Sequence, residues 1–473
     1  MIDQELAFSS AIDLIKLIKT KQISPTELLE LYFERINKLN PKLNSYINLT
    51  YSKAIEEAKI AEKSIIDKET LGPLHGLPIA IKDTQMTKGV LTTMGSVIFK
   101  DNIPKDNAAV VEKVLDSGSI MIGKTNVPEL GLVGNCENSI GIEGFNPWDI
   151  SKTPGGSSGG AAASVAAGLA PIATGSDGGG SIRIPSSFCG VYGIKPTFGR
   201  VSGYTGQYSS LPNFGSQNGP ISRTVKDAAL LLEVMSGYDS RDHFSLRETP
   251  PNFTKSIDKN IKGLKIAFSK DFGFANVHPE VLEVVSNAAK LFESLGCNVE
   301  EFKLNLQNPY EAFGAVHDFH FFQNFNKYLD KYNDQLTDFV KFAIEKGSKV
   351  KLSEYSKAIN NIYEQRATIN DIFFEYDLLI SPVSCFPAFS KVSFEEDSSQ
   401  GFEYPPHFFN GDFTFHINIS GNPAASIPAG FSSEKMPIGL HIIGSHGDEE
   451  TVLAASAAFE KSRPWLIHKP SVS

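Results

Sequence analysis

The sequence predicts an α/β layered fold in one continuous domain, and three observations support this fold class. Short apolar runs that end at a charge or a polar residue indicate buried strands at 76–83 and 119–126. A helical pattern at 110–118 stands between them, and the same order of strand, helix and strand returns at 263–304. No repeat and no linker long enough to split the chain interrupts this order, so we expect a single large domain.

The first 70 residues are helical in pattern and are expected to form an N-terminal segment of the same domain, with residues 71–473 as its main body. Ser24-Pro25-Thr26-Glu27 is typical of a capping box with proline at the first helical position. Asn40-Pro41 is the expected end of that helix. A second helix is predicted over 51–67.

The later elements follow from the same patterns. The alanine-rich run 161–170 predicts a helix with small side chains that suit close packing. Residues 305–375 are expected to be mostly helical, and the polar stretch 391–406 is expected to be a surface loop. The remaining predictions are strands at 263–269, 297–304, 376–382, 422–430 and 437–444, and helices at 278–296 and 448–462.

The composition narrows the classes of function. The chain has 473 residues, a formal net charge of −10 and 41% hydrophobic residues, which suits a globular protein with a sizeable core. An acidic balance argues against binding along a phosphate backbone, so no nucleic-acid partner is expected. The first 22 residues carry acidic groups and lack a long apolar stretch, and no run approaches 18 apolar residues. We therefore expect no signal peptide, no membrane span and a cytoplasmic location.

The four cysteines are far apart and form no CxxC pair, which indicates neither a zinc site nor a disulfide framework. His317-Asp318-Phe319-His320 has the look of a metal-binding pair. Side chains that are packed or that line a pocket are the simpler interpretation. The phenylalanines at 313–325 are either core residues or the wall of an apolar substrate pocket.

The stretch TPGGSSGGAAA at 153–163 has three local interpretations. A flexible linker is disfavoured because a helix-forming run follows at once. A phosphate loop would need a Gly-Lys-Ser/Thr ending or a GxGxxG spacing, and neither is present. A nucleophile elbow matches GxSxG, yet polar residues and a proline precede it where an apolar strand is required. His416, His441 and His446 are only nominal partners for such a triad.

A second glycine-serine element, GSDGGGSIRIPSSFCG, follows at 175–190. Three glycines before Ser181 leave consecutive backbone N–H groups uncrowded, as an oxyanion hole requires, although a glycine turn would look the same. Lys82 ends the apolar run 77–81, where burial would favour a neutral amine that can act as a base. A strand-end lysine that reaches solvent is the alternative.

Residues 154–202 resemble the signature region of the amidase signature family, and the likeness extends through 74–83, 121–131, 146–148, 219–235, 376–383, 422–431 and 437–444. The lysine, the doubled serine and the Gly-Gly-Ser-Ile-Arg element occur together, in order. The resemblance implies a central mixed β-sheet covered by helices on both faces. It also implies an amidohydrolase that acts on linear amide bonds through a seryl acyl-enzyme and needs no cofactor or metal.

The resemblance assigns roles position by position. Ser181 is the nucleophile, Ser157 the bridging serine on a cis peptide, and Lys82 the base. The other implied sites are the oxyanion hole at Gly178, Gly179, Gly180 and Ser181, substrate contacts at Gly131, Cys136, Ser157 and the loop 204–214, and loop-orienting residues at Ser158, Asp177 and Arg183. Many members carry threonine or a larger residue at 178 or 179, where this chain has glycine.

Two kinds of family member fit the sequence. One is a stand-alone amidase for a small or aryl-substituted amide, and the other is the catalytic subunit of a glutamine-dependent tRNA amidotransferase. The latter usually carries a Gly-rich segment with paired arginines in its later half. Residues 314–342 are aromatic instead, and Arg366 is the one arginine between Arg247 and Arg463. The sequence therefore favours a stand-alone amidase with a small-molecule substrate, and leaves the oligomeric state open, a homodimer included.

Overall fold

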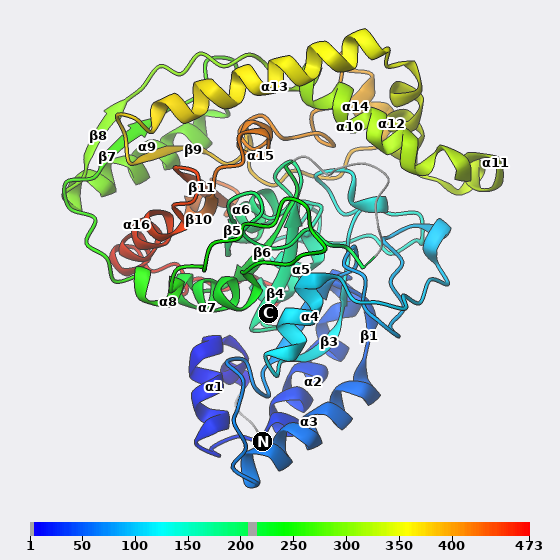
Figure 1. The fold of residues 1–473 in the computed structure, drawn as a ribbon, viewed down its shortest axis with the longest axis vertical. Coiled ribbons are helices and arrows are strands. Elements are labelled where there is room, and N and C mark those ends of the chain that lie inside the picture. Colours follow the sequence, from blue (N-terminus) through cyan, green and yellow to red (C-terminus); the bar gives the residue numbers. More distant parts are fainter. Residues whose placement is uncertain (1–3, 207–214) are drawn as a thin grey trace.

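The computed structural model describes residues 4–206 and 215–473, which form one eleven-stranded mixed sheet with helices around it (Figure 1). The strand order is β1-β3-β2-β4-β6-β5-β10-β11-β9-β7-β8. Two groups of parallel strands, β3-β2-β4 and β9-β7-β8, flank a centre of antiparallel pairs. This is the predicted α/β fold class.

The strands are β1 (Tyr46–Leu49), β2 (Pro78–Lys82), β3 (Ile120–Thr125), β4 (Ile172–Asp177), β5 (Tyr192–Lys195), β6 (Gln217–Ser222), β7 (Lys265–Phe268), β8 (Asn298–Glu301), β9 (Leu378–Pro382), β10 (Ala424–Phe431) and β11 (Pro437–Gly444). Every residue of β2, β3, β9 and β11 is buried. Strands without an exposed side require cover on both faces of the sheet, and the helices provide it.

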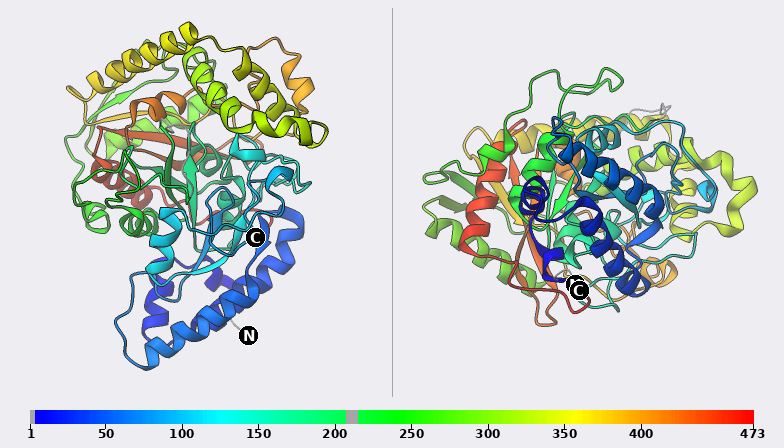
Figure 2. Two further views of the ribbon diagram at one scale, coloured as in Figure 1. Left: turned by 45° about the vertical axis from the view of Figure 1, so that its right-hand side comes forward. Right: turned by 90° about the horizontal axis from the view of Figure 1, so that it is seen from below.

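The α-helices are α1 (Ala11–Lys19), α2 (Pro25–Leu43), α3 (Tyr51–Ile66), α4 (Ala109–Asp116), α5 (Gly159–Ala166), α6 (Arg183–Cys189), α7 (Val225–Met235), α8 (Phe253–Ser256), α9 (Pro279–Ser294), α10 (Tyr310–Phe325), α11 (Leu329–Tyr332), α12 (Asp338–Lys349), α13 (Leu352–Ile372), α14 (Phe394–Ser398), α15 (Phe415–Ser420) and α16 (Glu449–Ser462). The 3-10 turns are η1 (Gln4–Phe8), η2 (Val97–Phe99), η3 (Glu129–Gly131), η4 (Asn326–Tyr328) and η5 (Asn333–Gln335). Helices α1 to α3 lie at one end of the molecule, and α10, α12 and α13 lie at the other (Figures 1 and 2).

Most predicted elements are confirmed, including the capping box, in which Glu27 N–H donates to Ser24 Oγ and Ser24 N–H to Glu27. The predicted end at Asn40-Pro41 is wrong, because α2 continues through Pro41 to Leu43. A proline so close to the end costs the helix little, since Asn44 then takes a left-handed conformation and its N–H closes the last turn on the Asn40 carbonyl.

Two further predictions need correction. The first 70 residues are not helical throughout, because β1 pairs antiparallel with β3 and extends the sheet at its edge. The stretch 391–406 is not simply a surface loop, since it contains α14, whose Asp397 is fully buried and accepts hydrogen bonds from the backbone and ring of His407. A four-residue strand and a five-residue helix are too short to show a period in the sequence.

Helix α5 is buried at every position, and it explains the alanine-rich run behind the doubled serine. A Cβ atom on Gly160 would lie 2.3 Å from the backbone nitrogen of Asn126 and 2.5 Å from the Ser45 carbonyl oxygen. Only small side chains allow such close backbone approach. The helix is therefore a rigid support directly behind Ser157 and Ser158.

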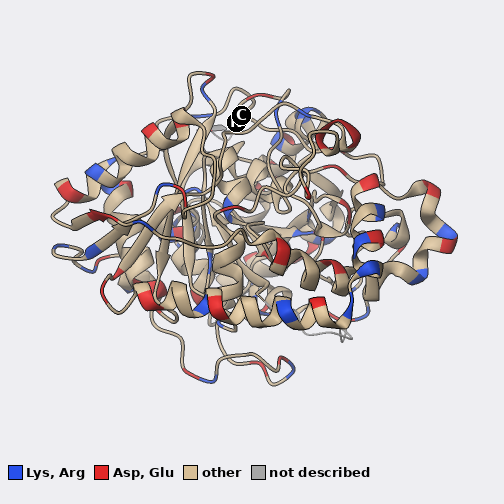
Figure 3. Cartoon of the chain, turned by 90° about the horizontal axis from the view of Figure 1, so that it is seen from above, with Lys and Arg blue, Asp and Glu red and all other residues tan. Residues whose placement is uncertain are grey.

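Within the described residues, no helix has the length and apolar character needed to cross a membrane. Acidic and basic residues are interspersed over the helices that face the viewer in Figure 3. In that view the charges form no continuous basic stripe of the kind that tracks a nucleic-acid backbone.

Candidate active site

Lys82 is the last residue of β2, and its side chain is fully buried. Its Nζ lies 2.8 Å from Ser157 Oγ, 2.9 Å from Ser176 Oγ and 3.2 Å from the Ser176 carbonyl oxygen. Burial lowers the pKa of Lys82 to about 7, although the charge of Asp177 works in the opposite direction. A large share of the amine is therefore neutral near pH 7 and able to accept a proton from a neighbouring hydroxyl.

Ser157 lies on the segment that leads into α5, and the peptide bond between Gly156 and Ser157 is cis. A Cβ atom on Gly156 would come 1.9 Å from the Asn135 carbonyl oxygen, so only glycine fits there. The next residue, Ser158, accepts a long hydrogen bond from Ser176 N–H, and its own N–H donates to the Ser181 carbonyl at 3.1 Å. Ser158 thus joins the loop of the bridging serine to the loop that carries Ser181.

Ser181 follows the glycine run between β4 and α6. Gly180 has a φ of +124°, and a Cβ atom there would lie 2.4 Å from Thr414 Oγ1. Both conditions exclude other residues. The Gly180 N–H, one of the donors expected for an oxyanion hole, donates to Asp177 Oδ1 at 2.7 Å and is therefore already paired.

The other two glycines of the run differ in the space around them. A Cβ atom on Gly179 would lie 2.5 Å from the Phe415 ring, whereas one on Gly178 would meet only Ser216, at 3.6 Å. Both glycines line the same cavity as Ser181. Position 178 has room for a side chain, and position 179 does not.

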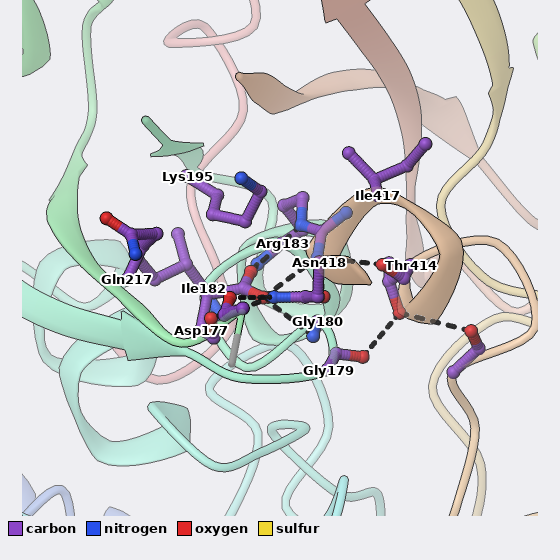
Figure 4. A network of polar contacts seen from close by, with 12 residues as sticks. Asp177, Gly179, Gly180, Ile182, Arg183, Lys195, Gln217, Thr414, Ile417 and Asn418 are labelled. Carbon is purple, nitrogen blue, oxygen red and sulfur yellow. Dashed lines mark hydrogen bonds and ion pairs between the residues drawn. The ribbon is translucent and has the colours of Figure 1, made fainter. Parts of the chain in front are cut away.

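A buried ion pair holds the glycine run from behind (Figure 4). Arg183 contacts both carboxylate oxygens of Asp177, at 2.9 and 2.8 Å, and also donates to Asn418 Oδ1 and to the Thr414 carbonyl. Asn418 Nδ2 in turn donates a hydrogen bond to Asp177 Oδ1 at 2.9 Å. Burial alone would raise the pKa of Asp177, but Arg183 and Asn418 outweigh it and hold this pKa well below its usual range.

One cavity of about 740 Å³ brings the predicted residues together. Ser157, Ser181, Gly178, Gly179 and Gly131 are all among its lining residues. A Cβ atom on Gly131 would lie 3.7 Å from Ser157 Oγ, so the η3 turn borders the bridging serine directly. A substrate in this cavity reaches both serines.

Cys136, for which a substrate contact is predicted, is a buried thiol. It is 2% exposed and is absent from the residues that line the cavity. Its sulfur instead packs against Gly144 and the start of α5, where Cβ atoms on Gly144 and Gly159 would lie 2.8 and 3.2 Å away. Burial raises the pKa of this thiol to about 12, which keeps it protonated and unreactive.

The predicted contact loop 204–214 is described only in part. Tyr204 and Thr205 line the cavity, and 207–214 lie outside the described residues. His416, His441 and His446 are not among the lining residues, which agrees with the rejection of a nucleophile elbow.

Sequence reasoning missed Ser176, the second hydroxyl on Lys82. Thr174 and Ser176 alternate along β4 and therefore share one side of that strand. Thr174 Oγ1 accepts from the Lys82 backbone N–H and Ser176 Oγ from Nζ. A hydroxyl at every second position of a strand next to a buried lysine is the signal that was available.

An aromatic wall extends from the glycine run into the cavity. The Phe415 and Phe313 rings stack at 4.1 Å between centroids and 19° between planes, and His317 and Phe321 continue the stack at 5.4 and 6.1 Å. Phe313, His317 and Phe321 follow one another at four-residue intervals on α10, which aligns their side chains on one face. Both histidines of the metal-like motif, His317 and His320, are thus pocket-lining residues.

The fold and the site both match known proteins. The family model described as Amidase matches residues 27–453 of this chain. The chain belongs to the amidase signature family. As a family member it is an enzyme that acts on amide C–N bonds, as the sequence predicted.

Proteins of two kinds are similar to this chain over nearly its whole length. An acylamidase of Rhodococcus erythropolis is 34% identical over 100% of this chain and 99% of its own length. A glutamyl-tRNA(Gln) amidotransferase subunit of Lactiplantibacillus plantarum is 36% identical over 99% of this chain and 98% of its own. The crystal structure of a bacterial aryl acylamidase of the family superposes with a TM-score of 0.91 at 31% identity, covering 97% of each chain.

Proposed function

We propose that this chain hydrolyses the amide of a small or aryl-substituted carboxylic acid derivative through Ser181, Ser157 and Lys82. The observation that carries the proposal is the buried, partly neutral Lys82 amine 2.8 Å from Ser157 Oγ, in a cavity that Ser181 also lines. A hydroxyl becomes a nucleophile when a nearby base removes its proton. Lys82 has the position and the pKa of that base.

In this mechanism Lys82 Nζ takes a proton from Ser157 Oγ, which takes one from Ser181 Oγ. Ser181 Oγ forms a bond to the amide carbonyl carbon, and the carbonyl oxygen becomes an oxyanion. The proton then passes through Ser157 to the leaving nitrogen, which departs as a neutral amine when the C–N bond breaks. Water hydrolyses the seryl ester by the same proton path in reverse.

The oxyanion is assigned to the N–H groups of Gly178, Gly179 and Ser181, which line the cavity. We leave Gly180 out because its N–H already donates to Asp177. The Asp177–Arg183 pair supports this arrangement, since it holds the loop by contacts on the side away from the substrate. Donors that are fixed before the reaction need no reorganisation in the transition state.

The walls of the cavity favour an uncharged substrate with a flat apolar part. The stacked rings from Phe415 to Phe321 present an extended π-surface beside the glycine run. Among the described lining residues, Arg241 is the one lysine or arginine, and its guanidinium is paired with Asp239 and Glu112 at 2.7 and 2.6 Å. The segment 207–214 contains no lysine or arginine either.

The second candidate function is that of the catalytic subunit of a glutamine-dependent amidotransferase, which the 36% identity to one such protein favours. Glutamine carries a carboxylate that needs a cationic partner. The paired state of Arg241 makes the cavity less suited to glutamine than to a neutral amide.

A panel of amides distinguishes the two functions. Neutral anilides and small alkyl amides are assayed beside glutamine, with and without mischarged tRNA and candidate partner subunits. We expect the chain alone to hydrolyse neutral amides at least about tenfold faster, by kcat/KM, than glutamine. Glutaminase activity that appears only with partner subunits would establish the second function instead.

A further inference from the structure

Asn410 is an unusual residue in the wall of the cavity. It is 2% exposed and is one of the residues that line the cavity. Neither Nδ2 nor Oδ1 has a hydrogen-bond partner among the described residues. Buried carboxamides are almost always paired, because an unpaired one loses its bonds to water and gains none.

The fold around Asn410 does not depend on its side chain. The Gly134 N–H donates to the Phe408 carbonyl at 2.8 Å, and the Gly411 N–H donates to the Tyr310 hydroxyl at 3.0 Å. The Tyr310 hydroxyl in turn donates to the Phe409 carbonyl. The main chain is thus fixed on both sides of Asn410 by other groups, so the backbone fold here does not need the carboxamide.

The carboxamide lies beside the segment that borders the bridging serine. A Cβ atom on Gly134 would lie 2.0 Å from Asn410 Oδ1, so glycine at 134 is what makes room for the amide. Gly134 is three residues beyond Gly131, the neighbour of Ser157 Oγ. Ser181, Gly134 and Asn410 all line the same cavity.

The atoms left unpaired define the group that would satisfy them. Nδ2 offers hydrogens and Oδ1 accepts one, so the complementary group has one acceptor and one donor side by side. A primary or secondary amide and a urea have this pattern. A carboxylate has no hydrogen for Oδ1, and an alkyl or aryl group has neither a donor nor an acceptor.

We infer that Asn410 is a specificity-determining residue that pairs with a second, non-scissile amide or urea group of the substrate. This inference rests on the proposed amidase function and narrows its substrate class to neutral amides that carry a further amide-like group. The aromatic wall then binds the flat part of the substrate, while Asn410 fixes the position of the scissile amide relative to Ser181.

Two matched substrate pairs test the inference. On the amine side, 4-carbamoylanilides are compared with 4-isopropylanilides, and on the acyl side a carbamoyl-terminated acyl chain is compared with an isopropyl-terminated one. Each pair exchanges an amide for an alkyl group with the same number of heavy atoms. The readout is the ratio of kcat/KM within a pair, measured in the wild type, in Asn410→Leu and in Asn410→Ala. Since both members of a pair meet the same enzyme, any loss of folded protein cancels.

We expect the wild type to prefer the amide-bearing member of at least one pair, and both variants to lower that ratio by about tenfold or more. Equal ratios in the wild type and the variants, for both pairs, would overturn the assignment of Asn410 and leave the proposed amidase function intact. Failure of the wild type to hydrolyse any of the four substrates would instead contradict the proposed hydrolysis of small or aryl-substituted amides.

Discussion

Lys82 Nζ lies 2.8 Å from Ser157 Oγ at the end of a fully buried strand. The two residues are 75 positions apart in the sequence. Ser157 lies just before α5, which packs against β2, the strand that ends at Lys82. Burial, more than any ion pair, sets the protonation state of this lysine. The activity should therefore depend on the pH range in which Lys82 loses its proton.

The pH dependence of turnover follows from the lowered pKa of Lys82, which is about 7. The base must be neutral, so kcat/KM is expected to fall about tenfold for each pH unit below 7 and to level off above it. A profile of kcat/KM against pH for a neutral anilide measures this. A flat profile between pH 5 and 8 would show that no group with this pKa is required.

The profile alone does not identify the lysine, because burial also lowers the pKa of Lys195 to about 7. Lys195 Nζ donates to the Pro196 carbonyl at 2.9 Å and is not among the cavity-lining residues. We expect Lys82→Ala to lose at least about a thousandfold in kcat/KM at pH 7. Lys195→Met is the matched control and should keep the midpoint of the profile, with circular dichroism confirming the fold of both. If the midpoint of the pH profile shifts in Lys195→Met but not in Lys82→Ala, Lys195 rather than Lys82 would be the base.

Two neighbouring glycines are expected to respond differently to alanine. Gly178→Ala places its methyl group in the cavity, 3.6 Å from Ser216, so the melting temperature should change little and KM should report any effect. In Gly179→Ala the new methyl group would lie 2.5 Å from the Phe415 ring. This contact should displace the loop that carries Ser181 and lower kcat about a hundredfold. Similar kinetics in the two variants would contradict the position of Phe415 against Gly179.

The Asp177–Arg183 pair is expected to stabilise the fold as well as the site. Both side chains are 0% exposed, so Arg183→Met leaves a buried carboxylate without its cation and should lower the free energy of unfolding by about 3–5 kcal/mol. Urea denaturation measures this change. The surface pair Lys357–Glu311 is the control, since Lys357→Met should have little effect. Equal effects of the two substitutions would argue against a structural role for Arg183.

The sequence predicted the parts of the site that are local in the chain. The Gly-Gly-Ser-Ser and Gly-Gly-Gly-Ser elements each lie within a few residues, and their glycines, apart from Gly178, are required by close contacts that any side chain would disturb. The apolar run before Lys82 left two possibilities, a buried amine and a strand-end lysine that reaches solvent, and the side chain is fully buried. Long, strongly patterned elements such as α9 and β11 were predicted from their local patterns.

Long-range contacts could not be predicted in this way. Asn418 reaches Asp177 from 241 positions away, and nothing in the local pattern of either residue indicates the other. The diversion of the Gly180 N–H to Asp177 depends on the backbone angles of a single turn. Asn410 lies between Phe409 and Gly411 in the sequence, in no recognisable motif, and only the missing partners in the folded chain distinguish it.

The central claim is that Ser181 is the nucleophile, and covalent labelling tests it most directly. The enzyme is treated with a fluorophosphonate, and its intact mass and peptide map are recorded for the wild type, for Ser181→Ala and for Ser216→Ala, which removes another cavity-lining hydroxyl. We predict one adduct on Ser181 in the wild type and in Ser216→Ala, and neither adduct nor amide hydrolysis in Ser181→Ala. An adduct on another residue, or amide hydrolysis that persists without the Ser181 hydroxyl, would contradict the account.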